Sequence, residues 1–364
     1  MTGDRIMRRF AGHSHHRRCH ETTPVIELDG VPVTVSVDGD GTLWTCDLIG
    51  GECAKRPLEL DAARPEDDWY YENGLWDEDD PDEEERPKFE ADAWEIVSKL
   101  TVAHLDDRPV VITGGGRHDL HHRGHNDTVG GAVRVWDLRT GRKIGKTLPS
   151  WHHSLGVCSL TTVTSDQGLI ALSSSEDGRL RAWNLTRGGE SVADIHGSGN
   201  GAMGAGLVDG RPVAVTGGED DSLQAWDLLS GEQIGENLTG IEPVVRAIAI
   251  TEVNGRAVVV AGGDGKALQR WDLTTQELLG SPMTGHTSSI HTLETATVAG
   301  RAIALTDSPD GTTRLWDLAS GQHIGDPLTG HDLQMVTETA GTPVAVTESP
   351  EDGIRVWDLT LATR

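Results

Sequence analysis

The sequence has few basic residues and no long apolar run. Its 364 residues include 31 Lys plus Arg against 58 Asp plus Glu, which gives a formal net charge of −27. Because binding a phosphate backbone requires a basic surface, this balance argues against nucleic acid as the main partner. No run of about 18 apolar residues occurs, so we expect no membrane partner. The segment Met1 to His20 carries five Arg and no apolar stretch, which is unlike a secretory signal.

Cysteine is also scarce. The four cysteines have no CxxC spacing and are too few to staple a chain of this length. They are Cys19, Cys46, Cys53 and Cys158. This pattern fits a reducing compartment, and we expect a cytoplasmic protein.

Aromatic residues make up only 4% of the chain, yet 11 of them are Trp, and 45 residues are Gly. Such a skew indicates one turn-rich pattern that is repeated many times. The motif Trp-Asp/Asn-Leu occurs at intervals of 41 to 47 residues, at Trp136, Trp183, Trp226, Trp271, Trp316 and Trp357. Trp44, in the related segment WTCDL, adds one earlier unit and makes seven.

Each unit contains three short apolar stretches separated by Gly, Asp and Pro, followed by a fourth stretch that ends in a small polar turn. Residues 246–253, 256–261, 267–273 and 277–283 illustrate the pattern. Four strands per period of about 45 residues are typical of one propeller blade. The sequence therefore predicts an all-β, seven-bladed β-propeller of four-stranded blades, with residues 1–364 as a single domain.

At this point the chain resembles the WD-repeat β-propeller family over nearly all of its length. The Gly-His that precedes each blade in this family is present in LTGHTSS, with His286, and in LTGHDLQ, with His331, whereas Ile241 replaces the His in LTGIEPV. The resemblance implies a structural hydrogen-bond network of His286, Thr306, Asp310 and Trp316. Phrases such as GRPVAVTGG also look similar to standalone WD-repeat proteins of actinobacteria, so we expect a bacterial protein.

The two ends of the chain fit the same template. After Trp357 only seven residues remain, too few to form the last strand of the seventh blade. Residues Asp4 to His13 occupy the place that IGDPLTGH fills elsewhere. We therefore expect the N-terminal segment to supply the outer strand of the last blade and to close the ring, which removes an unpaired sheet edge.

Two insertions exceed the template. Residues 61–90 lie between the last strand of the first blade and the first strand of the second, and residues 117–128 lie between the second and third strands of the second blade. The family resemblance implies that both connections open onto the same face of the propeller. Loops of this length in a compact fold are usually functional or disordered.

The first insertion is acidic and aromatic. Residues 66–90 hold 13 acids and two bases, together with four large aromatic residues within eight positions. Three interpretations stay open: a solvated acidic spacer, a docking loop or lid, and a metal-binding loop. For a docking loop, the candidate partner-binding residues are Trp69, Tyr70, Tyr71 and Trp76 as anchors and Asp79, Asp80, Glu83, Glu84 and Glu85 for charge.

The second insertion is rich in histidine. Neutral imidazoles with nearby carboxylates suit transition metals, so the candidate metal ligands are His118, His121, His122 and His125. Their spacing matches no recognised metal signature, and His-rich turns are also ordinary solvated loops.

Two functions follow from these loops. The favoured one is a non-enzymatic scaffold for protein–protein interaction, with no catalytic residues and no cofactor, whose acidic loop suits a basic protein or peptide. The alternative is a metal-binding protein or metalloenzyme that uses the His-rich loops on the same face and a transition metal as cofactor. The sequence leaves enzymatic activity undecided between the two.

Overall fold

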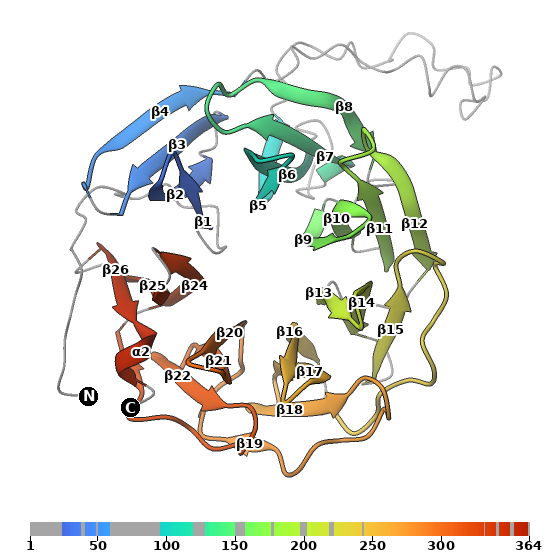
Figure 1. The fold of residues 1–364 in the computed structure, drawn as a ribbon, viewed down its shortest axis with the longest axis vertical. Helices are drawn as coiled ribbons and strands as arrows, with labels where there is room; N and C mark the ends of the chain where they lie inside the picture. The colour runs from blue at the N-terminus through green and yellow to red at the C-terminus, as the bar shows by residue number, and fades with distance from the viewer. Residues whose placement is uncertain are drawn as a thin grey trace, which may run out of the picture.

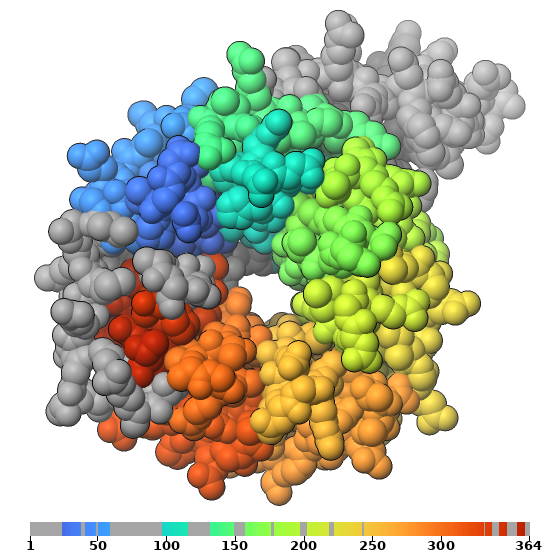
Figure 2. Space-filling model, in the orientation of Figure 1, coloured from blue at the N-terminus to red at the C-terminus, as the bar shows by residue number. Residues whose placement is uncertain are grey.

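The second strand of each repeat is a run of β-branched and small apolar residues, such as LIAL at 169–172 and VVVA at 258–261. These side chains are buried on both faces of their sheets, because a neighbouring sheet packs against each face. In the computed structural model the repeats form seven sheets in a ring (Figure 1), with an opening at its centre (Figure 2). This arrangement confirms the predicted all-β, seven-bladed β-propeller.

The structure describes residues 24–37, 41–48, 50–58, 95–118, 128–149, 157–175, 178–196, 202–217, 222–241, 244–330, 332–339, 342–349 and 353–362. Within these ranges no helix is long and apolar enough to cross a membrane.

Consecutive strands of a blade are antiparallel neighbours in the order of the chain. Blade 1 contains β1 (Val25–Leu28), β2 (Val31–Val37), β3 (Thr42–Asp47) and β4 (Cys53–Pro57). Blade 2 contains β5 (Glu95–Leu105), β6 (Arg108–His118), β7 (Thr128–Asp137) and β8 (Lys143–Pro149). Blade 3 contains β9 (Val157–Ser165), β10 (Gly168–Ser175), β11 (Arg179–Asn184) and β12 (Glu190–His196). Blade 4 contains β13 (Met203–Val208), β14 (Arg211–Gly217) and β15 (Leu223–Asp227).

The remaining blades follow the same meander. Blade 5 contains β16 (Val245–Val253), β17 (Arg256–Gly263), β18 (Ala267–Asp272) and β19 (Met283–Thr284). Blade 6 contains β20 (Thr292–Val298), β21 (Arg301–Ser308), β22 (Thr312–Asp317) and β23 (Leu328–Thr329). Blade 7 contains β24 (Asp332–Thr339), β25 (Thr342–Ser349) and β26 (Gly353–Asp358), and a single helical turn, α2 (Leu359–Ala362), follows it.

The outer strand is shorter than predicted in blades 4 to 6. In blade 5 we expected a strand over 277–283, but the segment makes only an isolated bridge between Trp271 and Leu278 before the two-residue β19. Each of these segments contains a glycine with left-handed backbone, where the pairing is interrupted: Gly235 (φ 67°), Gly280 (φ 68°) and Gly325 (φ 64°). In blade 2 the equivalent Gly145 (φ 71°) lies within β8, where the pairing shifts register and then continues, so the glycine alone does not end the strand.

The ring is closed by core packing between its first and last blades. Val25 and Leu48 of blade 1 lie in one apolar cluster with Val344, Val346 and Val356 of blade 7. The start of α2 directly after β26 agrees with the expectation that the C-terminal end does not form the fourth strand. The predicted closing strand, Asp4 to His13, lies outside the described residues, and so does His331.

The register of blade 1 differs from the sequence prediction. In blades 2 to 7 the repeat Trp directly precedes the Asp or Asn that ends the third strand. In blade 1 this strand ends at Asp47, and the residue before it is Cys46. Trp44, which we expected as the repeat Trp, lies two positions earlier and pairs with Ser36. Cys46 therefore holds the position of the tryptophan.

Cys46 forms a disulfide with Cys53, its direct partner on β4, with the Cα atoms 4.1 Å apart. In blade 6 the equivalent two positions are Trp316 and His323, whose rings meet edge to face. The disulfide thus links the third and fourth strands where another blade packs two rings. The cysteines therefore do not support a reducing compartment, and cytoplasmic localisation stays a prediction.

Candidate functional site

Connections between antiparallel strands alternate between the two faces of the ring. The connections from second to third strand and from one blade to the next open onto one face, here called the loop face. The turns after the first and third strands form the opposite face, here called the turn face. The two insertions join β4 to β5 and β6 to β7, so both attach to the loop face. The strand topology therefore agrees with what the family resemblance implied.

The residues predicted to form the site lie almost entirely outside the described residues. This holds for the aromatic and acidic candidates Trp69, Tyr70, Tyr71, Trp76, Asp79, Asp80, Glu83, Glu84 and Glu85. It also holds for His121, His122 and His125. His118 is the last residue of β6, and its backbone pairs with that of Thr128. The hairpin of blade 2 therefore extends into the second insertion. Among the described residues, no three potential metal ligands are grouped together.

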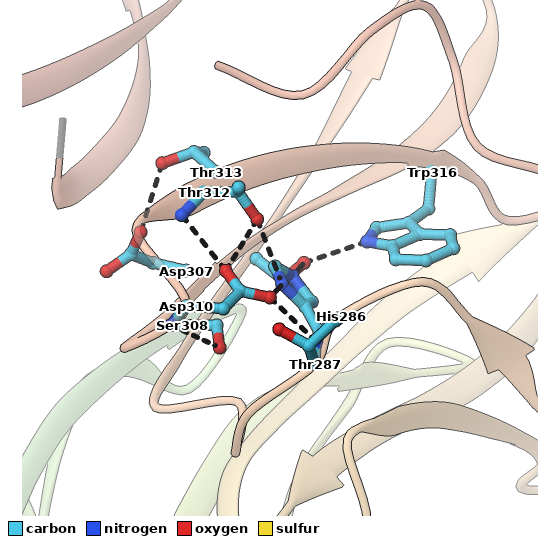
Figure 3. Close-up of polar contacts among 9 residues, drawn as sticks. His286, Thr287, Asp307, Ser308, Asp310, Thr312, Thr313 and Trp316 are labelled. Carbon is cyan, nitrogen blue, oxygen red and sulfur yellow. Dashed lines mark hydrogen bonds and ion pairs between the residues drawn. The ribbon is translucent and has the colours of Figure 1, made fainter. Parts of the chain in front are cut away.

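Within the described residues, blade 6 contains a network of hydrogen-bonded polar side chains (Figure 3). The Trp316 indole N–H donates to the Thr306 hydroxyl at 2.8 Å, and this hydroxyl lies 2.8 Å from His286 Nε2. His286 Nδ1 lies 3.0 Å from Asp310 Oδ2. The carboxylate also accepts from the backbone N–H of Thr287 and from the backbone and hydroxyl of Thr312. The four residues named from the family resemblance are therefore joined in one network.

Burial and hydrogen bonds together set the protonation states of this network. The His286 side chain is 0% exposed, and burial lowers the pKa of its imidazole, although Asp310 opposes this effect. Burial alone would raise the pKa of Asp310, but hydrogen bonds from Thr312, Thr287 and His286 outweigh it and hold the pKa at about 2. A neutral His286 donates Nδ1–H to the carboxylate and accepts the Thr306 hydroxyl proton at Nε2.

This arrangement is structural rather than catalytic. A His–Asp pair can activate a hydroxyl as a nucleophile, but here both His286 and the hydroxyl partner, Thr306, are fully buried, so a substrate has no access to them. Asp310 belongs to the turn between β21 and β22, whereas His286 precedes β20. The network therefore ties the entry of the blade to its central hairpin.

The aspartate of the Trp-Asp dipeptide has a separate role. The Oδ1 atom of Asp317 accepts the backbone N–H of Ala319 at 3.0 Å and that of Ser320 at 2.8 Å. Asp227 and Asp272 cap the equivalent turns of blades 4 and 5 in the same way. The repeated dipeptide thus supplies a buried indole and a turn cap on the turn face, so its recurrence in the sequence reflects folding.

Two carboxyl groups on blade 6 were not singled out from the sequence. Glu294 on β20 and Asp307 on β21 lie on the side of the sheet that faces blade 7, because they pair with Leu305 and Thr292, and Leu305 packs against blade 7. Burial raises the pKa of Glu294 to about 7. Burial raises the pKa of Asp307 to about 6, Asp332 adds to the increase, and a hydrogen bond from Thr313 opposes it.

The sequence pattern does not separate these two carboxyl groups from the other acidic residues. Only the register, which places them beside apolar residues between two blades, identifies them. Comparison with models of known protein families gave no match, and a search of curated proteins gave no relative. The resemblance to WD-repeat proteins therefore rests on the repeated motif, the seven blades and the blade 6 network.

Proposed function

We propose that this protein is a non-enzymatic scaffold of the WD-repeat type that binds a partner protein through the loop face. The observation that carries the proposal is the attachment of both long insertions to this one face of the ring. A rigid propeller does not need these loops for folding, and exposed loops on a rigid scaffold commonly provide binding specificity. Bacterial origin and cytoplasmic localisation are part of the same proposal.

The partner is a basic protein or peptide. Residues 66–90 carry a formal charge of −11, since 13 acids face two bases, and this charge attracts a basic surface over a distance of about 8 Å at physiological salt. The aromatic residues of the same segment supply apolar area at low entropic cost. Nucleic acid and membrane surfaces, which are themselves acidic, do not fit this charge.

Affinity purification from the native cell tests the proposal. The bait is the full chain, and the comparison is a chain that lacks residues 66–86. We expect a basic partner to be enriched by the full chain and lost with the deletion. A matched variant with Trp69, Tyr70, Tyr71 and Trp76 changed to Ser keeps the charge and removes the anchors. An unchanged set of partners in both variants contradicts the proposal, provided that near-ultraviolet circular dichroism shows an intact ring.

The alternative function is binding of a transition metal by His118, His121, His122 and His125. Its support is the His-rich sequence of residues 117–128, which attaches to the same face. Elemental analysis of protein purified without an affinity tag separates the two functions. About one equivalent of metal, lost when these four His are changed to Asn, favours the metal site.

A further inference from the structure

A groove lies on the turn face between blades 3 and 4, which are neighbours in the ring (Figure 1). Its volume is about 480 Å³. One wall is the turn between β9 and β10, with Thr164, Asp166 and Gln167. The other wall is formed by blade 4, from the turn between β13 and β14 and from the turn that follows β15. The groove therefore opens on the face opposite to the two insertions.

The groove exposes two leucine side chains. Leu207 is 45% exposed and Leu229 is 42% exposed, and both line the groove. Only four large hydrophobic residues in the described part of the chain are comparably exposed, and the other two, Val244 and Leu278, do not line it. Two of these four exposed side chains therefore lie in the same groove, which is typical of a surface that binds a ligand.

The repeat shows that folding does not require leucine at these positions. Leu207 pairs with the second residue of the next strand, and the positions with the same pairing in the other blades are polar or charged. They are Glu27, His104, Thr164, Glu252, Thr297 and Glu338. The residue three positions after the repeat Trp is Leu229 in blade 4, Thr274 in blade 5 and Ala319 in blade 6. The two leucines are thus particular to blade 4.

The groove walls are rigid. Asp227 accepts the backbone N–H of Leu229 at 2.8 Å, and the same carboxylate pairs with Arg211 at 2.7 Å. On the opposite wall Arg187 donates to Gln167 at 3.0 Å. Because these turns are already fixed, a ligand loses little free energy in ordering them.

The charge around the leucines is negative. Asp166 and Asp209 are exposed on opposite walls, and the structure shows no ion pair between either of them and another described residue. The positive charge of Arg211 is matched by Asp227. Two carboxylates beside two exposed leucines favour a ligand that carries an apolar side chain next to a cation.

We propose that this groove binds a linear segment of a partner protein in which a bulky apolar side chain is adjacent to Lys or Arg. The apolar side chain lies against Leu207 and Leu229, and the cation lies between Asp166 and Asp209. A second copy of this chain does not fit, because its net charge of −27 repels the acidic groove. The nine residues that line the groove are also far fewer than the 20 to 30 that each side of a stable interface supplies.

Selection from a random display library of linear peptides, with the full chain as target, tests the proposal. We expect enrichment of peptides with Leu, Ile, Met or an aromatic residue next to Lys or Arg. The double variant Leu207→Ser/Leu229→Ser should bind the enriched peptides about tenfold more weakly, since burying the exposed part of the two leucines together contributes about 1.4 kcal/mol. The matched control, Leu278→Ser, removes an equally exposed side chain elsewhere and should bind as the wild type does.

Charge reversal gives a second readout that does not depend on the leucines. The variant Asp166→Lys/Asp209→Lys should select peptides in which the apolar residue is next to Asp or Glu. A chain that lacks residues 66–86 should select the same peptides as the full chain, which separates this groove from the loop face. The proposal is overturned if no peptide is enriched, if the double serine variant binds equally well, or if charge reversal leaves the selection unchanged. It is also overturned if the chain that lacks residues 66–86 no longer selects these peptides.

Discussion

Blades 5 and 6 have the same backbone plan, yet they stabilise it with different chemistry. Their equivalent residues lie 45 positions apart, as Trp271 and Trp316 do. Blade 6 carries the His286–Thr306–Asp310 network, and blade 5 has Ile241, Ala261 and Gly265 at the same three positions. Ile241 and Ala261 join an apolar cluster in blade 5, and the Trp271 indole donates to the backbone carbonyl of Thr239 at 3.1 Å.

Between these two blades all three polar side chains of the network are exchanged together, although the Trp–Thr hydrogen bond also occurs in blades 2, 4 and 7. Loss of one partner would leave buried donors or acceptors without a hydrogen bond. Replacement of all partners by small apolar groups leaves no buried polar group that needs one. Blade 5 therefore shows that a blade of the same molecule forms with small and apolar residues in place of the network.

The largest expected effect comes from breaking the network of blade 6 at one residue. Asp310→Ala leaves His286, the Thr287 amide and Thr312 without their shared acceptor, which should cost about 3 kcal/mol of unfolding free energy. The triple variant His286→Ile/Thr306→Ala/Asp310→Gly copies blade 5 and should cost less than the single change. Urea unfolding followed by Trp fluorescence measures both. A triple variant that is less stable than Asp310→Ala would falsify the view that the network acts as a unit.

A smaller effect is expected from the reverse change in blade 5. Ile241→His places an imidazole beside Ala261 and Gly265, which offer it no side-chain partner, so stability should fall by about 2 kcal/mol. Adding Ala261→Thr and Gly265→Asp should recover most of this loss, because the three residues then reproduce the blade 6 set. The same unfolding measurement checks the prediction, and no recovery in the triple variant contradicts it.

The smallest effect concerns Glu294 and Asp307 of blade 6, whose equivalent positions in blade 5 are Ala249 and Gly262. The pKa of Glu294 is raised from 4.5 to about 7, so the folded state holds this proton more tightly than the unfolded state. The stability that the folded state gains from this tighter proton binding is present in full below pH 4.5 and is lost as the pH rises through 7. Glu294→Gln should remove this loss.

The expected gain for Glu294→Gln is about 1 kcal/mol at pH 8, since partial exposure to solvent weakens the effect, and close to zero at pH 5. Thermal unfolding at both pH values measures it. Glu232→Gln, at an exposed turn, serves as the control and should change stability at neither pH. Equal effects of Glu294→Gln at the two pH values contradict the prediction.

Repetition made much of the fold predictable. The spacing of the Trp residues gives the number of blades, and the Gly-His of LTGHTSS led through the family resemblance to all four members of the blade 6 network. The register of blade 1 was missed, because Trp44 is a closer match to the motif than Cys46, although Cys46 holds the repeat position. The shortened outer strands were missed because a left-handed glycine also occurs at this position in blade 2, where the outer strand is long.

The sequence by itself determined the number of blades and their strand order, because these depend on local patterns that recur with a fixed period, whereas the polar network followed from the family resemblance. Only the tertiary structure decided which side chains meet. It paired Cys46 with Cys53, placed Glu294 between two blades and brought Leu207 and Leu229 to one groove. Each of these follows from register and from the packing of neighbouring blades, and a one-residue change in register moves a side chain to the other face of its sheet.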